Sequence, residues 1–292
     1  MIPINLSGKT ALVTGVADTV GFGWHIAKVL QAAGAQVVLA VHPRVFNIVE
    51  KTLGRSANDE DRKLPFGVEG EFSPSKVYPS DLQYDTLADV PDEQYEVKGY
   101  SKDTDFTVSG LAESLKADFG SVDYIIHSVA FAREIKNPLI DTSRRAYLEA
   151  LSISAYSLTA LCHYCLPLME GREGAVVGLT YIGGDRAVPY YGGGMSSAKA
   201  ALQIDAKQLS YFLGQKGHRV NLVSPGPYAS RAARGIGDIG QMIDHAVAKS
   251  PLPRPIEAEE VANTVLFLLS PLSSAITGEV IYVDCGYHAM GT

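Results

Sequence analysis

The residue types that can do acid chemistry are concentrated between residues 181 and 199, directly after an apolar run at 175–179. The informative pair is Tyr191 and Lys199, because a helix that begins near the glycines between them would bring the lysine ammonium back toward the phenol. A tyrosine has an ordinary pKa of about 10, and a cation about 4 Å away stabilises its phenolate by about 4 kcal/mol at an effective dielectric near 20. The spacing therefore predicts a proton donor with a lowered pKa. A packed tyrosine and a surface lysine are the alternative.

A glycine-rich loop at residues 15–23 carries the second chemical signal. It lies between an expected strand at 9–15 and an expected helix at 24–33, and it reads GVADTVGFG. Glycines permit tight turns and let a pyrophosphate approach the N–H groups of a helix N-terminus. The spacing departs from G-x-G-x-x-G, so a turn needed only by the backbone is the alternative to a dinucleotide site.

The end of the second expected strand, residues 36–41, is where a NAD-binding unit commonly places an acid for the adenosine ribose. Here His42 and Arg44 follow the strand, and the acid is missing. A basic pair at this place could accept a 2′-phosphate, so the residues leave NADH, NADPH and an uninvolved solvated loop open. Asp81, after a third strand at 76–78, could accept from an adenine amino group or only cap a turn.

Composition limits the classes of partner. The chain has 292 residues, of which 46% are hydrophobic and 20% charged, and its formal net charge is −7. It has no overall field that attracts nucleic acid or an anionic membrane, so phosphates must be bound by local groups. We therefore expect neither nucleic acid nor a membrane as a partner.

The cysteines and the termini indicate a reduced, non-secreted protein. Cys162 and Cys165 lie in an apolar helical stretch, and with Cys285 they lack zinc-type spacing to a second ligand cluster, so we interpret them as reduced core residues and expect no metal site. The sequence has no uninterrupted apolar run of about 18 residues and no signal-peptide pattern. We expect a cytoplasmic location, with a plastid-type organelle as the alternative if a transit peptide was removed.

Apolar runs and helical periodicities alternate along the chain. They predict an α/β fold: a single Rossmann-type doubly wound parallel sheet of about seven strands, with helices on both faces. We expect one domain, residues 1–292, with loop excursions around residues 43–75 and 83–105. Further strands are expected at 122–127, 175–179, 219–223 and 279–283, and further helices at 107–119, 142–169, 196–213, 236–248 and 257–269.

Ligands in such a sheet bind beyond the carboxyl ends of the strands. The Gly15 loop, Asp81, Ser128, Tyr181 and Pro227 each follow an expected strand, so these separate features converge on one edge of the sheet. The two longest expected helices also have apolar faces, which fit either a subunit interface or packing on the sheet.

With these residues assembled, the chain resembles the short-chain dehydrogenase/reductase superfamily and, within it, the divergent branch of enoyl-acyl-carrier-protein reductases of type II fatty acid synthesis. The likeness extends over nearly the whole chain, and the long inserts match the plant, apicomplexan and chlamydial type. The motifs that carry it are Thr14 to Asp18 with Gly21 to Trp24, His127-Ser128, Leu179 to Tyr181 with Arg186 to Pro189, Tyr191 to Lys199, Gly226-Pro227 with Ser230 to Ala233, and Ser274 to Gly278.

The resemblance implies a catalytic role for three residues. Tyr191 would donate a hydrogen bond to the enolate oxygen of a trans-2-enoyl thioester, Lys199 would hold the nicotinamide ribose, and Tyr181 would line the acyl pocket. A classical short-chain ketoreductase carries a catalytic serine thirteen residues before the tyrosine, where this chain has Gly178. A carbonyl reductase or alcohol dehydrogenase, which needs that serine, and a non-catalytic nucleotide-sensing module are the rival functions.

The resemblance also implies a cofactor and partners. These are NAD(H), with NADP(H) left open by His42 and Arg44, an enoyl thioester carried on acyl carrier protein, and a homotetramer. Arg231 and Arg234 are the candidates for docking the acidic carrier. The residues that the resemblance assigns to the cofactor are Gly15, Asp18, Gly21, Phe22, Trp24, Asp81, Leu82, Ser128, Val129, Ala130, Lys199, Gly226, Pro227 and Tyr228.

Overall fold

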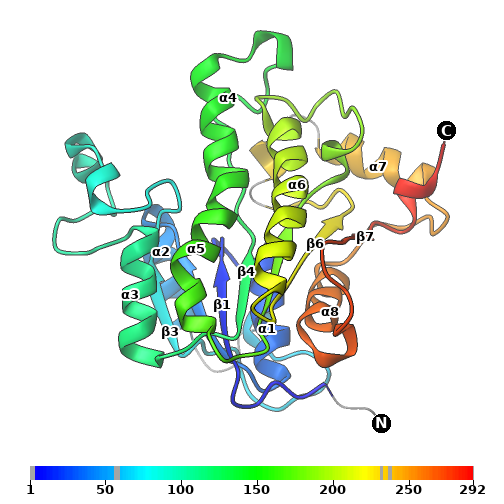
Figure 1. Cartoon of the computed structure of the whole chain (residues 1–292). Helices are drawn as coiled ribbons and strands as arrows, with labels where there is room; N and C mark the ends of the chain where they lie inside the picture. Colours follow the sequence, from blue (N-terminus) through cyan, green and yellow to red (C-terminus); the bar gives the residue numbers. More distant parts are fainter. Residues whose placement is uncertain (1–3, 56–59, 231–232, 236–238, 292) are drawn as a thin grey trace.

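The computed structural model describes residues 4–55, 60–230, 233–235 and 239–291. Its strands are β1 (Thr10–Thr14), β2 (Gln36–Val41), β3 (Lys76–Pro79), β4 (Tyr124–His127), β5 (Ala175–Leu179), β6 (Arg219–Pro225) and β7 (Val280–Val283). They form one parallel sheet with the order β3-β2-β1-β4-β5-β6-β7 (Figure 1). The predicted fold class is confirmed.

The central strands β1, β4 and β5 are buried along their whole length. Burial on both faces explains why they appear in the sequence as continuous apolar runs instead of alternating ones. β1 pairs with β2 on one side and with β4 on the other, so the strand order reverses between β1 and β4. Such a switch point leaves a crevice at the carboxyl ends of the strands.

Helices cover both faces of the sheet (Figure 1). They include α1 (Phe22–Ala32), α2 (Pro43–Leu53), α3 (Val108–Phe119), α4 (Arg144–Leu151), α5 (Ser157–Met169), α6 (Met195–Gly214), α7 (Ile239–Lys249) and α8 (Ala258–Leu269). One face packs against α1 and α8 in a core cluster that contains Val13 and Val265. The other face packs against α3, α5 and α6 in a cluster that contains Leu12 and Leu161.

The first excursion contains a helix where the sequence predicts loop. α2 lies inside the segment 43–75, with Pro43 at its first position and with the His42 side chain accepting from the Arg44 N–H. Both features favour a helix start. Val45, Phe46, Val49 and Leu53 pack in or against the core at helical spacing, so α2 is amphipathic and the prediction of a loop over its residues was wrong.

The second excursion, residues 83–105, projects to one side of the molecule (Figure 1) and has no α-helix or strand in it. It is ordered by aromatic packing. Tyr84 and Tyr100 approach Phe106 edge-on, with ring centroids 6.3 and 4.8 Å away. The Tyr100 hydroxyl also reaches Asp81, directly after β3, so this excursion is anchored at the carboxyl edge of the sheet.

The long helix expected at 142–169 is interrupted. Ser143 caps α4 by accepting from the Ala146 N–H, and a π-helical turn at Ser152–Tyr156 separates α4 from α5. By length and composition, Arg144–Met169 could cross a membrane, but half of its most apolar window is buried in the protein. Since α5 packs on the sheet, we interpret this apolar stretch as a core helix.

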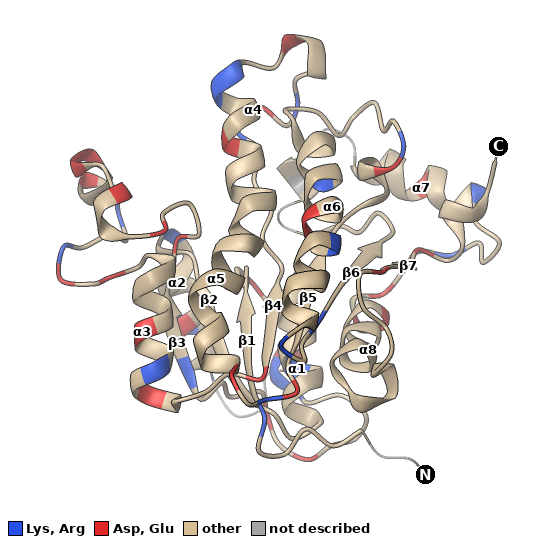
Figure 2. Cartoon of the chain, in the orientation of Figure 1, with Lys and Arg blue, Asp and Glu red and all other residues tan. Residues whose placement is uncertain are grey.

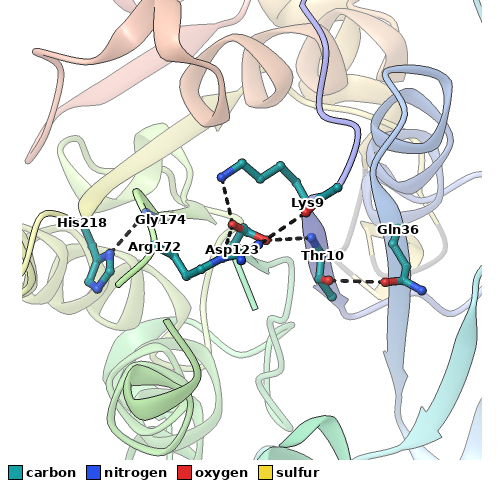
Figure 3. A network of polar contacts seen from close by, with 8 residues as sticks. Lys9, Thr10, Gln36, Asp123, Arg172, Gly174 and His218 are labelled. Carbon is teal, nitrogen blue, oxygen red and sulfur yellow. Dashed lines mark hydrogen bonds and ion pairs between the residues drawn. The ribbon is translucent and has the colours of Figure 1, made fainter. Parts of the chain in front are cut away.

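A buried ionic network joins the amino ends of the central strands (Figure 3). The fully buried Asp123 carboxylate accepts from Lys9 Nζ at 3.0 Å and from the Thr10 N–H at 2.9 Å. Arg172 donates to it twice, at 2.8 and 2.6 Å. Burial alone would raise the pKa of Asp123, but these hydrogen bonds outweigh it and lower the pKa. The network lies at the amino ends of the strands, opposite to the switch point at their carboxyl ends.

Candidate active site

The predicted functional segments lie together at the carboxyl ends of the strands. The Gly15 loop follows β1, Asp81 follows β3, Ser128 follows β4, Tyr181 follows β5, and Gly226 follows β6. Because all these strands are parallel, the predicted convergence holds.

The two tyrosines of the predicted reaction centre lie against each other. The ring centroids of Tyr181 and Tyr191 are 4.7 Å apart, with an angle of 56° between the ring planes. Tyr191 is 8% exposed, and both rings pack with Ala132 and Met195 in a small apolar cluster. The site therefore holds two phenol groups in one largely dry environment.

Lys199 lies in α6 and is buried. Its Nζ donates to the Leu179 carbonyl oxygen at 2.8 Å, which anchors the side chain at the end of β5. An ammonium group has three N–H donors, so this bond still allows Lys199 to hold further oxygen atoms. Burial lowers the pKa of Lys199 to about 8.

The predicted lowering of the Tyr191 pKa is wrong. Burial and the neighbouring Tyr181 raise the pKa of Tyr191, and burial also raises that of Tyr181. The Lys199 ammonium is directed to the Leu179 carbonyl oxygen instead. Near neutral pH, Tyr191 is therefore a neutral hydrogen-bond donor.

Glycines follow Tyr191 because another loop approaches its backbone closely. A Cβ on Gly193 would lie 2.5 Å from the Glu134 carbonyl carbon, and the Gly193 N–H donates to the Asn137 carbonyl oxygen at 3.0 Å. The Glu134 carboxylate accepts from the N–H and the hydroxyl of Ser143, at 2.8 and 2.7 Å. The Tyr191 loop is thus connected to the start of α4.

The geometry of the first glycine loop fits a dinucleotide. Gly15 has a φ of 77°, and a Cβ there would lie 2.1 Å from the Ser128 carbonyl oxygen, so only glycine lets the loops after β1 and β4 approach each other. α1 begins at Phe22, and its N-cap Gly21 provides no side-chain cap. The first turn of α1 also has no acidic residue. Its N–H groups and its dipole suit a pyrophosphate.

Asp18 and Phe22 order the loops at this end of the sheet. Asp18 Oδ1 accepts from the N–H groups of Val20 and Gly21, at 3.0 and 2.8 Å, and so forms the loop itself. The Phe22 ring lies 4.8 Å from the Tyr228 ring, which brings the segments after β1 and β6 into contact.

Trp24 and Leu82, both assigned to the cofactor by resemblance, have their side chains in the core. Trp24 is fully buried, packs edge-on against Phe72, and donates from its indole N–H to the Asp61 carbonyl oxygen at 2.9 Å. Leu82 is 6% exposed and packs in the cluster with α3 and α5. The Trp24 side chain therefore anchors the first excursion and is turned away from the crevice.

Asp81 is buried, and both its oxygens have partners within the chain. Oδ1 accepts from the Gln83 N–H at 3.1 Å, and Oδ2 accepts from the Tyr100 hydroxyl at 2.7 Å. The turn-capping interpretation is confirmed. A carboxylate has about four lone-pair sites, so a further contact to an adenine amino group is still compatible with this geometry.

The loop after β4, with Ser128, Val129 and Ala130, is held by the π turn. The Ser154 hydroxyl donates to the Phe131 carbonyl oxygen at 2.9 Å and accepts from the Phe131 N–H at 2.8 Å. The role of Ser154 could not be predicted from the sequence, because a π turn has no periodic signal that separates it from the surrounding helix.

His127, at the end of β4, is fully buried and bonds to the same helix. Ser157 Oγ donates to the Ile153 carbonyl oxygen, so it accepts from His127 Nε2–H, and both distances are 2.7 Å. Burial and the charge of Lys199 lower the pKa of His127 to about 3. His127 is therefore a neutral structural residue of the site.

The other residues singled out in the sequence are Gly226, the two arginines proposed for carrier docking, and the cysteines. The Gly226 N–H donates to the Val283 carbonyl oxygen at 2.9 Å, which joins the ends of β6 and β7. Arg231 and the side chain of Arg234 lie outside the described residues. Within the described part of the chain, His, Cys, Asp and Glu residues form no group of three or more that could hold a metal ion. The cysteines at 162 and 165 are buried in the core.

Known proteins decide the family. The model of the family described as enoyl-(acyl carrier protein) reductase matches residues 102–288. Over 99% of its length the chain is 50% identical to enoyl-acyl-carrier-protein reductase (NADH) 1, chloroplastic, of Oryza sativa subsp. japonica, of which it covers 77%. The chain belongs to the enoyl-acyl-carrier-protein reductase family.

Two other proteins of this family are similar to the chain over nearly its whole length. The NADH enoyl-acyl-carrier-protein reductase FabI of Aquifex aeolicus is 38% identical, with 98% of this chain and 93% of the relative covered. The crystal structure of the Plasmodium berghei enoyl-acyl-carrier-protein reductase with triclosan has a TM-score of 0.92 at 37% identity, and 97% and 99% of the two chains are covered.

Gly178 fits an enoyl-acyl-carrier-protein reductase better than a ketoreductase. It lies inside the buried strand β5, and a Cβ there would lie 2.7 Å from Leu222 Cδ2. A serine at this position would collide with the neighbouring strand unless Leu222 moved. The side chain of Tyr181, and no residue-178 hydroxyl, packs against the Tyr191 ring.

Proposed function

We propose that this protein catalyses the NADH-dependent reduction of trans-2-enoyl thioesters, carried on acyl carrier protein, in type II fatty acid biosynthesis. The observation that carries the proposal is the contact between Tyr181 and Tyr191, 4.7 Å between ring centroids, beside the dinucleotide crevice and without a serine at position 178. Membership of the enoyl-acyl-carrier-protein reductase family supports the same reaction.

The residues act through hydrogen bonds to developing charge. NADH, when bound, supplies the hydride that reaches C3 of the enoyl group. Negative charge then develops on the thioester oxygen, and the neutral Tyr191 hydroxyl donates a hydrogen bond to it in a site that excludes water. Tyr181 lines the acyl pocket. Lys199, fixed by the Leu179 carbonyl, holds the ribose hydroxyls and adds positive potential.

We propose that the cofactor is bound by the loops that follow the carboxyl ends of the strands. The Gly15 loop and the N-terminus of α1 hold the pyrophosphate, and the loop after β4 lies beside the nicotinamide. The proposed contact residues are Gly15, Asp18, Gly21, Phe22, Asp81, Ser128, Val129, Ala130, Lys199, Gly226, Pro227 and Tyr228, with Trp24 and Leu82 contributing through their backbone alone.

An apolar surface on α5 and α6 indicates how the protein assembles. Figure 2 shows α5 without a charged residue, and α6 exposes Ile204, Tyr211 and Phe212 at 55%, 65% and 61%. We propose that this surface is buried in a homotetramer of single-domain subunits. We propose a cytoplasmic location or a plastid, and the plastid alternative is supported by relatives in Oryza and Arabidopsis that are named chloroplastic. The acidic carrier is proposed to dock near Arg231 and Arg234.

Phenol deletions test the reaction. Tyr191→Phe removes the donor to the enolate and is expected to lower kcat about 100-fold, because one oxyanion donor contributes roughly this much. Tyr181→Phe is expected to cause a modest loss. The assay is NADH oxidation with a trans-2-enoyl-CoA, after fluorescence titration shows that NADH still binds. Tyr190→Phe, which changes an exposed neighbour, is the control. Equal rates for Tyr191→Phe and the control would refute the assigned role.

A further inference from the structure

The loop that follows Tyr181 is tied to the C-terminal segment at residues 282–290. The Arg186 guanidinium donates to the carbonyl oxygen of His288 and, at 3.1 Å, to the carbonyl oxygen of Met290. Hydrogen bonds from a charged donor are about twice as strong as those between neutral groups. One side chain of the loop therefore holds two backbone groups near the C-terminus.

The neighbouring residue makes a second tie to the same segment. Asp185 Oδ2 accepts from the Tyr282 hydroxyl at 2.5 Å and from Gln203 Nε2 at 3.2 Å. The Tyr282 ring in turn stacks on the His288 imidazole, with ring centroids 4.0 Å apart and 11° between the ring planes. The loop therefore contacts the segment at its start as well as near its end.

The C-terminal turn, residues 284–290, is shaped by bonds within itself. The buried Asp284 carboxylate accepts from the N–H groups of Gly286 and His288, at 3.0 and 2.8 Å. It also accepts from His288 Nδ1–H at 2.9 Å, because a carboxylate only accepts. Loss of the ties to the loop is therefore expected to displace the turn as a unit without unfolding it.

This turn lies between Tyr181 and α7. Its short helix, Tyr287–Ala289, is beside α7 (Figure 1), and the Tyr287 ring approaches the His245 ring of α7 edge-on, with 6.0 Å between centroids. Burial raises the pKa of Tyr181, and Tyr287 and Asp284 add to this rise. Such an electrostatic effect requires both groups to lie close to the Tyr181 phenol. The turn is therefore part of the surroundings of Tyr181.

A cavity of about 200 Å³ lies where the loop, α7 and the turn meet. Its lining includes Ile182 from the loop, His245 from α7, and Tyr287 and Met290 from the turn. Because the Met290 carbonyl oxygen is an acceptor of Arg186, the bond that holds the turn also fixes one wall of the cavity.

From these contacts we infer that Arg186 is a positioning residue for the acyl pocket. By holding the C-terminal turn against the loop after Tyr181, it sets the width of the cavity between them. The inference rests on the proposed function, in which Tyr181 lines the acyl pocket. The next residue, Ile182, lines the cavity, so the acyl chain of the thioester extends from Tyr181 into it.

Steady-state kinetics with a medium-chain trans-2-enoyl-CoA test the inference, and coenzyme A replaces the carrier so that carrier docking does not enter. Arg186→Met should raise KM for the thioester about tenfold and leave kcat and NADH affinity within about twofold, the pattern of lost substrate binding. Arg186→Lys keeps a charged donor and should recover part of the loss. Arg254→Met, which removes a half-exposed arginine paired with Glu260, is the control and should leave KM unchanged.

The acceptors of Arg186 lie at residues 288 and 290, so a chain that ends at Tyr287 lacks both. This truncation should raise KM by itself, and Arg186→Met in the truncated chain should add nothing further. Groups in direct contact show such non-additivity, whereas independent effects add. An unchanged KM in full-length Arg186→Met, or additive effects of the two changes, would overturn the inference.

Amide hydrogen exchange gives a readout that does not depend on the reaction. In Arg186→Met the amides at 182–190 and at 284–290 should both exchange faster, and in Arg254→Met neither segment should change. Faster exchange in only one segment, or in neither, contradicts the inference. A wild type that does not reduce the enoyl thioester refutes the proposed function instead, and exchange then still decides whether Arg186 couples the two segments. If Arg186→Met does not fold, Arg186→Lys takes its place in each measurement.

Discussion

The buried charge of Lys199 lowers the stability of the folded protein but is needed for the proposed contact with the ribose. Its pKa is lowered from 10.5 to about 8 by burial, so the charged form destabilises the folded protein, while the proposed ribose contact needs that charge. Below pH 8 the lysine is charged in both the folded and the unfolded state, and the penalty is complete. As the pH rises from about 8 to 10.5, the folded state releases its proton first and the penalty disappears.

Lys199→Met is therefore expected to stabilise the protein and to impair the cofactor site. At pH 7 the free energy of unfolding in urea should rise by about 2 kcal/mol, after allowance for the lost bond to the Leu179 carbonyl. The gain should shrink above pH 8. NADH affinity, measured by fluorescence titration, should fall at least about tenfold. Lys207→Met, an exposed change in the same helix, is the control. An unaltered NADH affinity would mean that the ribose role is wrong.

The position of the loop that carries Tyr191 depends on its contact with the loop before α4. Gly193 has a φ of 59° and lies against the Glu134 backbone, whereas Gly217 has a φ of 83° and a Cβ there would meet nothing within 4 Å. The pair separates backbone strain from close approach. Alanine at either position costs about 1–2 kcal/mol of strain, but only alanine at 193 must displace a neighbour.

Gly193→Ala is thus expected to lower kcat/KM for the enoyl thioester about 100-fold, since displacement of a reacting group by about 1 Å costs this much. Gly217→Ala should lose only the stability that corresponds to its backbone strain, measured by thermal unfolding, and should keep its activity. Equal activities of the two variants would show that the contact with residues 134–137 does not position Tyr191.

The whole molecule is held at its other edge by Asp123 (Figure 3). Asp123→Asn leaves Arg172 and Lys9 without a buried counter-charge, and it should lower the free energy of unfolding by about 3 kcal/mol. The lowered pKa of Asp123 means that its contribution is complete above pH 3.8 and is lost as the pH falls through the still lower folded value. NADH affinity should not change, because the network lies at the opposite edge. Asp92→Asn, whose ion pair with Lys102 is exposed, should have little effect on stability.

Much of the sheet and its topology could be predicted from the sequence. The apolar runs of β1, β4 and β5 and the parallel topology follow from burial on both faces, and with them the convergence of the Gly15 loop and Tyr181 on one edge. The helix α2 was missed although Val45, Phe46, Val49 and Leu53, which pack in or against the core, have helical spacing. The hydrogen bonds of the Tyr100 hydroxyl with His42 and Asp81 join residues up to 58 positions apart, and such contacts have no local sequence pattern.

The most direct test of the proposed reaction is NADH oxidation by the wild type with a short trans-2-enoyl thioester, run beside the matching 3-ketoacyl thioester. We predict turnover of the enoyl substrate alone, because the ring packed against Tyr191 is that of Tyr181 and position 178 is a glycine. Turnover of the ketoacyl substrate alone would contradict the account and place the protein among the carbonyl reductases.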